Sequence, residues 1–549
     1  MVADAGKSLA GFIKGNLSLF LAVFLLFMTA CYSLLRYVYR KLDQYNEIKV
    51  VVPFQQNKAL YIYWLIIFIC WLPYLIICFP ASSFGWDYHW QLLQGMGVVP
   101  FSNHHPIVSS LIYGLLYKIG FAVCGAYGGL FFTGLFQTTL MSFAMAYGLL
   151  TVRRTGANNK VVRCLLIFIC ICPVFAGHAV WLIKDSIYSS LVVIILSLCL
   201  NYRLERNKAS YPLLIGIVGL LATMYRSEGI IIVSLFYLAI TFDTFKKAQK
   251  KASKRIIVSF VSLLVLFVSI KVGIRVSGIP ATSTARESLT IFSAQIIDCV
   301  KKHPSDLKER EKEVLFKSYI DLDYAVLKYN EVDRDAIKTI DMNREENMDY
   351  LKVWFQIGIR HKGDYIDSFL RGTRGYWWMF RDPKLIPHST PLYATEDDFA
   401  NTNRREMPVA MNSWLKRTYE SYGIEVNVNK TIGELVLENN PDLEGIFYVK
   451  SYFPNVRDFL NDFLDRLKKI PLLQFVFVPG FYFFIFILSM GYFFIRKRFY
   501  FWQCLPILAI VIVDCFSPIN GYMRYFLPVA LSSILIVGLC FTGKEDSIN

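Results

Sequence analysis

A series of long apolar runs constrains the fold of this chain more than any other feature. A run of about 18 or more apolar residues is long enough to cross the hydrocarbon core of a bilayer as an α-helix. Such runs recur toward both ends of the 549-residue sequence, 55% of which is hydrophobic. The first run, Leu17–Leu35, lacks a small-residue cleavage site and is expected to be retained. The sequence therefore predicts an all-α polytopic membrane protein and excludes an ordinary soluble domain.

The basic residues indicate how the spans are oriented. The net charge of +16 requires no nucleic acid partner, because most Lys and Arg residues lie in short loops between spans, as in cytoplasmic loops of membrane proteins. With these loops inside, we expect a bundle of about 11 spans with the N-terminus outside. Ile107–Ile119 is short for a span and carries Lys118, so we expect it to lie along the outer surface as a juxtamembrane helix.

Three parts follow from the distribution of apolar and polar residues. Residues 1–274 form an N-terminal transmembrane module, whose first outer loop covers residues 80–122. Residues 275–470 are polar and carry helix-like patterning, which predicts a mostly helical extracytoplasmic domain. Residues 471–549 contain the C-terminal transmembrane helices.

The first outer loop concentrates reactive side chains beside an apolar run. A carboxylate and imidazoles just outside a span are wet enough to ionise and close enough to meet a lipid, and tryptophans suit the membrane interface. The loop residues of interest are Trp86, Asp87, His89, Trp90, His104 and His105. An alternative is a re-entrant loop whose polar groups only satisfy one another. A divalent metal held by Asp87, His104 and His105 is a further alternative, although no fourth ligand is evident.

A second set of charged residues lies on the same predicted side of the membrane. It consists of Lys184 and Asp185, Arg226 and Glu228, Arg524, and Asp514 in a neighbouring apolar run. Basic residues usually gather on the cytoplasmic side of a membrane protein, so basic residues on the outside are exceptions. Such exceptions favour the binding of an anion such as a lipid phosphate. Each also has a structural explanation: Lys184 beside Asp185 as an anchoring pair, Arg226 with Glu228 as a plain salt bridge, and Arg524 as an interface anchor.

These residues resemble motifs of a known superfamily. Gly-Trp-Asp-Tyr-His-Trp at 85–90, followed by Asn-His-His-Pro at 103–106, is similar to the first extracytoplasmic loop of GT-C glycosyltransferases. In these polytopic enzymes an acidic residue after an early span is followed by a His-Pro or Pro-Pro element that leads into a juxtamembrane helix. The Lys184-Asp185 pair, residues 225–229 and Arg524 resemble a bacterial branch of this superfamily. The two histidines before Pro106 depart from better-known members.

The resemblance implies a GT-C-like bundle and an inverting transfer from a polyprenyl-phosphate-linked sugar to a cell-envelope acceptor. By this analogy Asp87 is the general base, and Lys184, Arg226 and Arg524 bind the donor phosphate. The remaining candidates orient these cations or contact the sugar or acceptor: His89, His104, His105, Asp185, Glu228, Trp86, Trp90 and Trp181. The expected location is a bacterial plasma membrane with the site facing outward. The partners are then membrane lipids, the lipid-linked donor and a glycan acceptor, and a metal requirement is left open.

Three other functions are alternatives. A polysaccharide polymerase or ligase would share the large outer segment and the basic residues, but its donor would be diphosphate-linked. A transporter or flippase of lipid-linked sugars would have the same spans, and we expect it to carry deep charges and an internal repeat, which the sequence does not display. A purely structural membrane protein would leave the polar cluster without a purpose.

Overall fold

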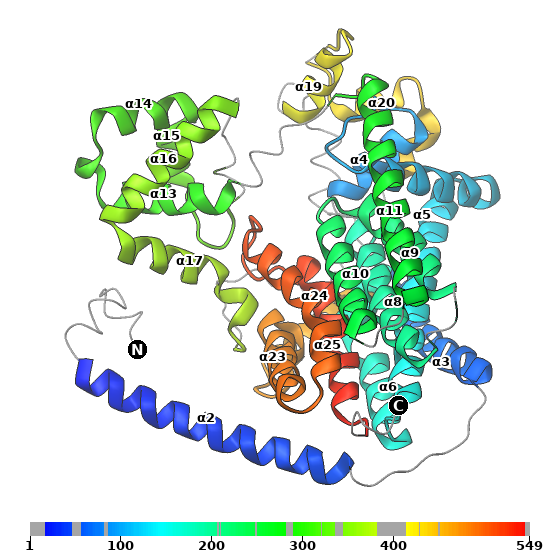
Figure 1. The fold of residues 1–549 in the computed structure, drawn as a ribbon. Coiled ribbons are helices and arrows are strands. Elements are labelled where there is room, and N and C mark those ends of the chain that lie inside the picture. Colours follow the sequence, from blue (N-terminus) through cyan, green and yellow to red (C-terminus); the bar gives the residue numbers. More distant parts are fainter. Residues whose placement is uncertain are drawn as a thin grey trace.

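The computed structural model describes residues 17–46, 56–81, 86–205, 208, 210–246, 250–280, 289–319, 321–334, 337, 344–380, 413–427, 429–447 and 451–543. Within these residues every regular element is a helix, as predicted (Figure 1). The helices that coincide with predicted spans are α2 (Leu17–Asn46), α3 (Gln56–Ile77), α5 (Ile107–Arg154), α6 (Asn159–Ile171), α7 (Pro173–Val180), α8 (Lys184–Leu204), α9 (Ser210–Tyr225), α10 (Gly229–Lys246), α11 (Lys250–Val276), α23 (Pro479–Arg496), α24 (Arg498–Cys515) and α25 (Met523–Cys540).

Seven helices in the described residues are long and apolar enough to cross a membrane, or eight if the bent pair α6–α7 is one span. This supports a multi-pass helical membrane protein. The pair is bent by 55°, because Pro173 cannot continue the hydrogen-bond ladder of α6. The apolar helices α9 and α10 are shorter. The count of about 11 spans therefore stays a prediction.

Two helices occupy the centre of the bundle and two others its periphery. In the apolar windows of α8 and α25, 83% and 89% of the residues are buried, whereas only 17% and 11% are buried in α3 and α11. The exposed residues of the peripheral helices are large and apolar, for example Leu65 and Val265, which suits contact with lipid rather than water. The centre of the bundle is thus the pair of helices that begin with Lys184 and Met523.

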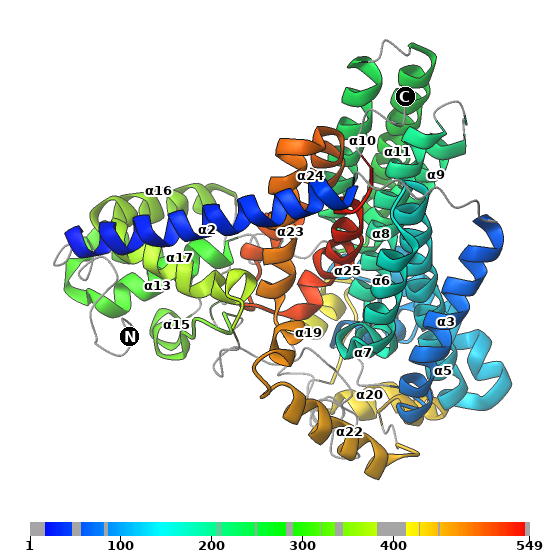
Figure 2. The ribbon, with the colours of Figure 1, turned by 90° about the horizontal axis from the view of Figure 1, so that it is seen from below.

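Helix α2 lies outside this bundle (Figures 1 and 2). Its apolar N-terminal half is exposed, including Leu25 and Leu26. Its other end is attached to α23 and α25: the Tyr39 hydroxyl donates to the carbonyl of Leu488 at 2.9 Å, and Asn46 donates to the carbonyl of Cys540 at 2.9 Å.

A short helix, α4 (Trp86–Met96), packs across the first part of α5, and the two helices contact each other at glycines. A Cβ atom added at Gly95 would lie 1.9 Å from the carbonyl oxygen of Ser110, and one at Gly114 would lie 2.3 Å from the carbonyl oxygen of Gly95. The two backbones are therefore in direct contact. Helix α5 then breaks at Cys124 and Gly125, where φ of Gly125 is +63°. The break separates residues 107–123 from the long apolar part of the helix.

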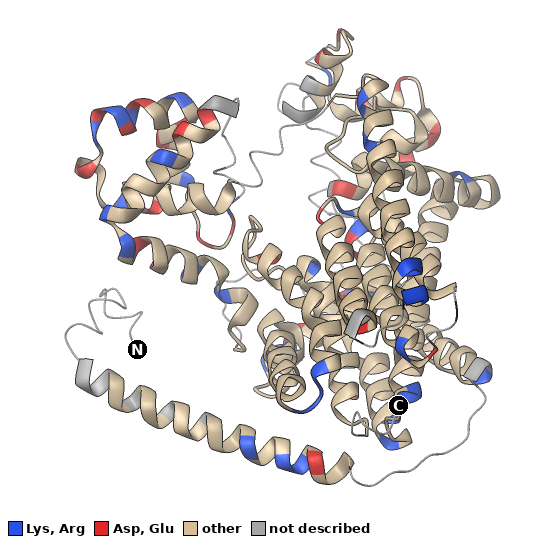
Figure 3. Ribbon diagram, in the orientation of Figure 1, with Lys and Arg blue, Asp and Glu red and all other residues tan. Residues whose placement is uncertain are grey.

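The polar segment between α11 and α23 contributes to two hydrophobic cores. Its first helices pack around their own core beside the bundle (Figure 1): α13 (Thr290–Lys302), α14 (Glu309–Ser318), α15 (Leu322–Lys328), α16 (Arg344–Arg360) and α17 (Lys362–Trp377). Its later helices are α19 (Ser413–Ser421), α20 (Ile432–Leu437), α21 (Glu444–Phe447) and α22 (Pro454–Leu467). They contribute residues such as Leu415, Ile432 and Leu464 to the hydrophobic core of the bundle. Figure 3 shows charged residues concentrated on α13–α17 and sparse along the bundle helices.

The contact between α4 and α5 yields a stability prediction. We expect Gly95→Ala to lower the thermal stability of the purified protein, because the new methyl group would overlap the backbone of Ser110. Overpacking of this kind costs about 1–3 kcal/mol or more. Gly273→Ala is the matched control, since a Cβ atom there meets nothing within 4 Å. Equal melting temperatures for the two variants in detergent would contradict this account of the contact.

Candidate functional site

Six charged side chains form a continuous series of ion pairs, which we call the charged network. They come from the first turn of α4, the start of α8, the loop between α9 and α10, and the start of α25. Its members are Asp87, Lys184, Asp185, Arg226, Glu228 and Arg524. The structure thus brings together residues that the sequence places in four separate segments.

Arg524 is the centre of the charged network. Its Nη2 pairs with Oδ2 of Asp87, and its Nε lies 2.5 Å from Oδ2 of Asp185. The side chain of Arg524 is 9% exposed and that of Asp185 only 1%. Charges this deeply buried are tolerated only when they are paired, so these two residues fix each other and the helix starts that carry them.

The charged network becomes more accessible toward its two ends. Nζ of Lys184 lies 3.2 Å from Oδ2 of Asp87, whose side chain is 25% exposed. Nη1 of Arg226 lies 2.9 Å from Oδ1 of Asp185, and its Nε pairs with Glu228, whose side chain is 27% exposed. Lys184 therefore pairs with Asp87, although its sequence neighbour Asp185 is the partner that an anchoring role predicts. The Arg226–Glu228 salt bridge exists, but as one part of the larger network.

The cations determine the protonation state of Asp87. Burial alone would raise the pKa of Asp87, but the charges of Arg524 and Lys184 hold that pKa well below its usual value. Burial, followed by the charge of Lys184, lowers the pKa of His105 well below its ordinary value, and the opposing effect of Asp87 is smaller. At neutral pH Asp87 is therefore a carboxylate and His105 a neutral imidazole.

The other loop candidates lie at different depths. His105 is buried, and its ring contacts that of the exposed His104, with 4.6 Å between ring centroids. His89 and Trp90 are buried against each other in α4, with ring centroids 5.9 Å apart. The side chain of Trp86 lies outside the described residues.

Side-chain amides and hydroxyls hold the start of α8 in place. Nε2 of Gln137 on α5 lies within 2.5–3.3 Å of the carbonyl oxygens of His178, Ala179 and Trp181. The Ser186 hydroxyl donates to the carbonyl of His178 at 2.7 Å. These bonds satisfy backbone groups that the break between α7 and α8 leaves without helical partners. They thereby position Lys184 and Asp185.

The start of α25 is held from the side by α17. The backbone N–H of Gly375 donates to the Asn520 side chain at 2.8 Å, and the Tyr376 hydroxyl donates to the carbonyl of Ile519 at 2.8 Å. Gly521 has φ of +67° and approaches Gly375 so closely that a Cβ atom on it would lie 2.6 Å from the Gly375 Cα. The polar unit containing α17 thus reaches the loop that leads into Arg524.

Aromatic rings enclose the arginines, and sequence reasoning missed most of them. The Arg226 guanidinium lies 5.5 Å from the ring centroid of Tyr188 and 5.4 Å from that of Tyr525. The Arg524 guanidinium also lies 5.4 Å from the Tyr525 ring, a distance typical of cation–π contacts. Tyr525 adjoins Arg524 in sequence, and Tyr188 follows Asp185 by three helical positions. Residues three positions apart on a helix lie on the same face, so the sequence could have indicated that Tyr188 lies beside Asp185 and its partners.

Several buried polar atoms beside the charged network make no hydrogen bond within the part of the chain that the structure describes. Among them are Nε2 of His178, Nε1 of Trp181 and Oδ2 of Asp514. Trp181 packs against Tyr522, with ring centroids 6.3 Å apart, and Tyr522 directly precedes the first residue of α25. Buried polar groups are normally satisfied, so these atoms are available to a ligand or to water.

We expect Arg524→Met to destabilise the protein by about 3–5 kcal/mol, because it leaves the buried carboxylate of Asp185 and the half-buried carboxylate of Asp87 without their shared cation. Arg496→Met is the matched control. Arg496 pairs with Asp43 at 3.0 Å, but its side chain is 51% exposed, and such surface pairs contribute about 0–1 kcal/mol. Chemical or thermal unfolding in detergent measures the difference, and equal losses would argue against a buried structural ion pair.

Comparisons with known proteins add a family but no activity. No curated protein and no solved structure matches the chain significantly. The family of unknown function DUF6020 matches residues 97–547, a range that begins after Asp87 and contains the other five members of the charged network. Because the match covers most of the chain, this protein belongs to the DUF6020 family.

Proposed function

We propose that this protein is an inverting GT-C-type glycosyltransferase. It moves a sugar from a polyprenyl-phosphate-linked donor to a cell-envelope acceptor, such as a surface polysaccharide or teichoic acid, at the outer face of a bacterial plasma membrane. One observation carries the proposal: the carboxylate of Asp87 pairs with Lys184 and with Arg524, which it shares with Asp185, at one end of an apolar helical bundle. The resemblance of residues 85–90 and 103–106 to the first outer loop of GT-C enzymes points to the same chemistry.

The reaction needs a base and a stabilised leaving group. An acceptor hydroxyl attacks the anomeric carbon of the donor while Asp87 takes its proton. The bond between the anomeric carbon and the phosphate oxygen breaks, its electron pair leaves with the polyprenyl phosphate, and the anomeric configuration inverts. Negative charge develops on the departing phosphate, where fixed cations are most effective in a site of low dielectric constant.

The ion pairs do not use all the nitrogens of the two arginines, although Arg524 also hydrogen-bonds Tyr522. The ion pairs use Nε and Nη2 of Arg524, and Nε and Nη1 of Arg226, so one terminal nitrogen of each guanidinium takes no part in them. Asp185 holds both guanidiniums in fixed planes. A guanidinium that is already oriented loses little conformational entropy when it binds a phosphate.

The same cations can couple phosphate departure to proton transfer. Arg524 and Lys184 hold the pKa of Asp87 well below its usual value in the free protein. When the leaving phosphate attracts these cations, their hold on Asp87 weakens and the carboxylate becomes more basic. The base is thus strengthened at the stage of the reaction that requires it.

Two further features suit a carbohydrate substrate. The Nε1 group of the buried Trp181 has no hydrogen-bond acceptor in the described residues and suits a sugar hydroxyl, and His105 is a neutral imidazole near Asp87. A cavity of about 490 Å³ lies where the loop after α4 meets α19 and α20, lined by polar groups including Asn427, Lys430 and Glu438. Met96 in its wall is nine residues from Asp87, about 14 Å along the helix axis, so the cavity suits a remote part of the acceptor.

We expect Asp87→Asn to reduce sugar transfer at least ~10²-fold while donor binding persists, because the amide keeps the size of the carboxylate but cannot accept the proton. The assay uses purified protein, polyprenyl-phosphate sugars and cell-envelope acceptors. Asp43→Asn is the control, since Asp43 pairs with Arg496 in a separate exposed contact. Full activity in Asp87→Asn would refute the assignment of the base. A wild-type protein that moves lipid-linked sugars across vesicles without transferring them would favour a transporter.

The low pKa of Asp87 predicts an unusual pH profile. A carboxyl group whose pKa is depressed in the folded protein keeps its charge above about pH 3.9, the ordinary value, and loses it only as the pH falls through the lower folded pKa. We therefore expect no loss of kcat/KM between pH 7 and pH 5 from protonation of Asp87. Lys184→Met removes one of the charges that lower the pKa of Asp87, so the acid limb of the kcat/KM profile should move to higher pH. An acid limb that does not move in this variant would contradict the proposed coupling.

A further inference from the structure

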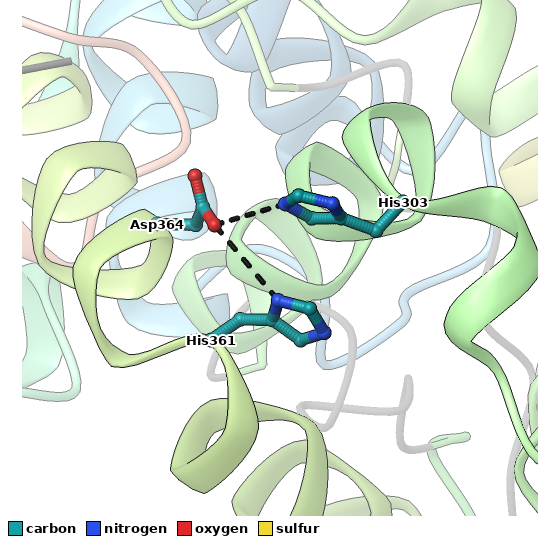
Figure 4. A group of neighbouring side chains, drawn as sticks. All are labelled: His303, His361 and Asp364. Carbon is teal, nitrogen blue, oxygen red and sulfur yellow. Dashed lines mark hydrogen bonds and ion pairs between the residues drawn. The ribbon is translucent and has the colours of Figure 1, made fainter. Parts of the chain in front are cut away.

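A separate cluster of potential metal ligands lies in the polar unit formed by α13–α17. His303 follows the last residue of α13, His361 lies between α16 and α17, and Asp364 is in the first turn of α17. Their donor atoms all lie within 4.8 Å of one another. Figure 4 shows both imidazole rings directed at the same carboxylate.

The contacts point to one shared position. Nε2 of His303 lies 3.1 Å from Oδ2 of Asp364, and Nδ1 of His361 lies 4.0 Å from the same oxygen (Figure 4). Donor atoms around a tetrahedral zinc ion are about 3.3 Å apart, given bonds of about 2.0–2.1 Å. The first distance already fits. For the second, the two rings, which now stack with centroids 4.5 Å apart and planes 19° apart, must tilt so that their nitrogens face one point.

The surroundings of the cluster suit a bound cation. The neighbouring Lys302 contacts Oδ1 of Asp364 at 3.1 Å, so it does not occupy the oxygen that faces the histidines. Lys302 also pairs with Asp298 at 3.0 Å and therefore keeps a partner whatever binds Asp364. Nε2 of His361 faces Asp306 at 3.6 Å, which is the kind of outer carboxylate that orients a metal-bound histidine.

The ligands are rigidly placed and partly open to solvent. The backbone N–H groups of His303 and His361 donate to the carbonyls of Cys299 and Ile357, which ties both residues to the ends of packed helices. Side-chain exposures of 37% for His303, 14% for His361 and 26% for Asp364 leave space for water or another ligand. Two imidazoles and one carboxylate with open positions match a transition metal rather than calcium or magnesium.

We propose that His303, His361 and Asp364 bind a divalent transition metal, with Zn²⁺ as the expected ion. The metal joins the end of α13 to the start of α17, residues that are 61 positions apart in sequence. Because the other end of α17 holds the loop before Arg524, the site also braces the approach to the charged network. This inference is independent of the proposed glycosyl transfer.

The test measures metal binding rather than activity. Full-length protein, purified in detergent with a tag free of histidine, is stripped with EDTA, equilibrated with Zn²⁺ and analysed by elemental analysis. We expect about one zinc per chain in the wild type, and none in the double variant His303→Ala/His361→Ala. Substitution of Co²⁺ should produce the visible absorption bands of a low-symmetry site with nitrogen ligands. A wild-type protein that retains no zinc would overturn the proposal.

Two further variants keep the test decisive if the double variant fails to fold. Asp306→Asn leaves all three ligands intact and should weaken Zn²⁺ binding by about 10- to 100-fold. His104→Ala removes an exposed histidine of the first outer loop and should leave the zinc content unchanged. Loss of zinc in His104→Ala would assign the metal to Asp87 and its neighbouring histidines instead, and unchanged affinity in Asp306→Asn would also contradict the proposed site.

Discussion

The buried ion pairs of Arg524 are the constraint on which the rest of this structure depends. A guanidinium that is 9% exposed needs partners in a medium of low dielectric constant, and Asp87 and Asp185 supply them. Each of these three residues stands at or near the start of a helix. Pairing them therefore fixes the starts of α4, α8 and α25 at one point, and α8 and α25 are the two most buried membrane helices.

The surrounding structure serves to hold these helix starts. The glycine contact between α4 and α5 brings Asp87 inward, and the amide of Gln137 ties the break before α8 to α5. On the other side, α17 supports the loop before Arg524 through Gly375 and Tyr376. Elements from the bundle and from the polar unit thus converge on one cluster of charges. This convergence is the physical basis for proposing the charged network as the functional site.

The balance of charge in the network explains how three cations can be clustered and ordered in the absence of a bound anion. Its three cations are matched by three carboxylates, so the arginines are held in place without a bound phosphate. In the proposed reaction a donor phosphate would compete with Asp87 for Lys184 and Arg524, which would link the leaving group to the base. The proposed zinc site lies at the other end of α17 and would make that support more rigid, whereas the charged network is the site of the proposed chemistry.

The sequence by itself determined the helical membrane architecture and singled out all six members of the charged network. Apolar runs become helices because the backbone must satisfy its own hydrogen bonds in lipid, and ionisable residues at span ends are conspicuous against them. Tertiary structure alone decided the partners. Arg524 meets Asp87 across 437 positions, and Lys184 pairs with Asp87 rather than with its neighbour Asp185. Such pairing depends on how helices cross, which local patterns do not encode. For the same reason, only the fold brought Tyr188 to Arg226, and His303 to His361 and Asp364.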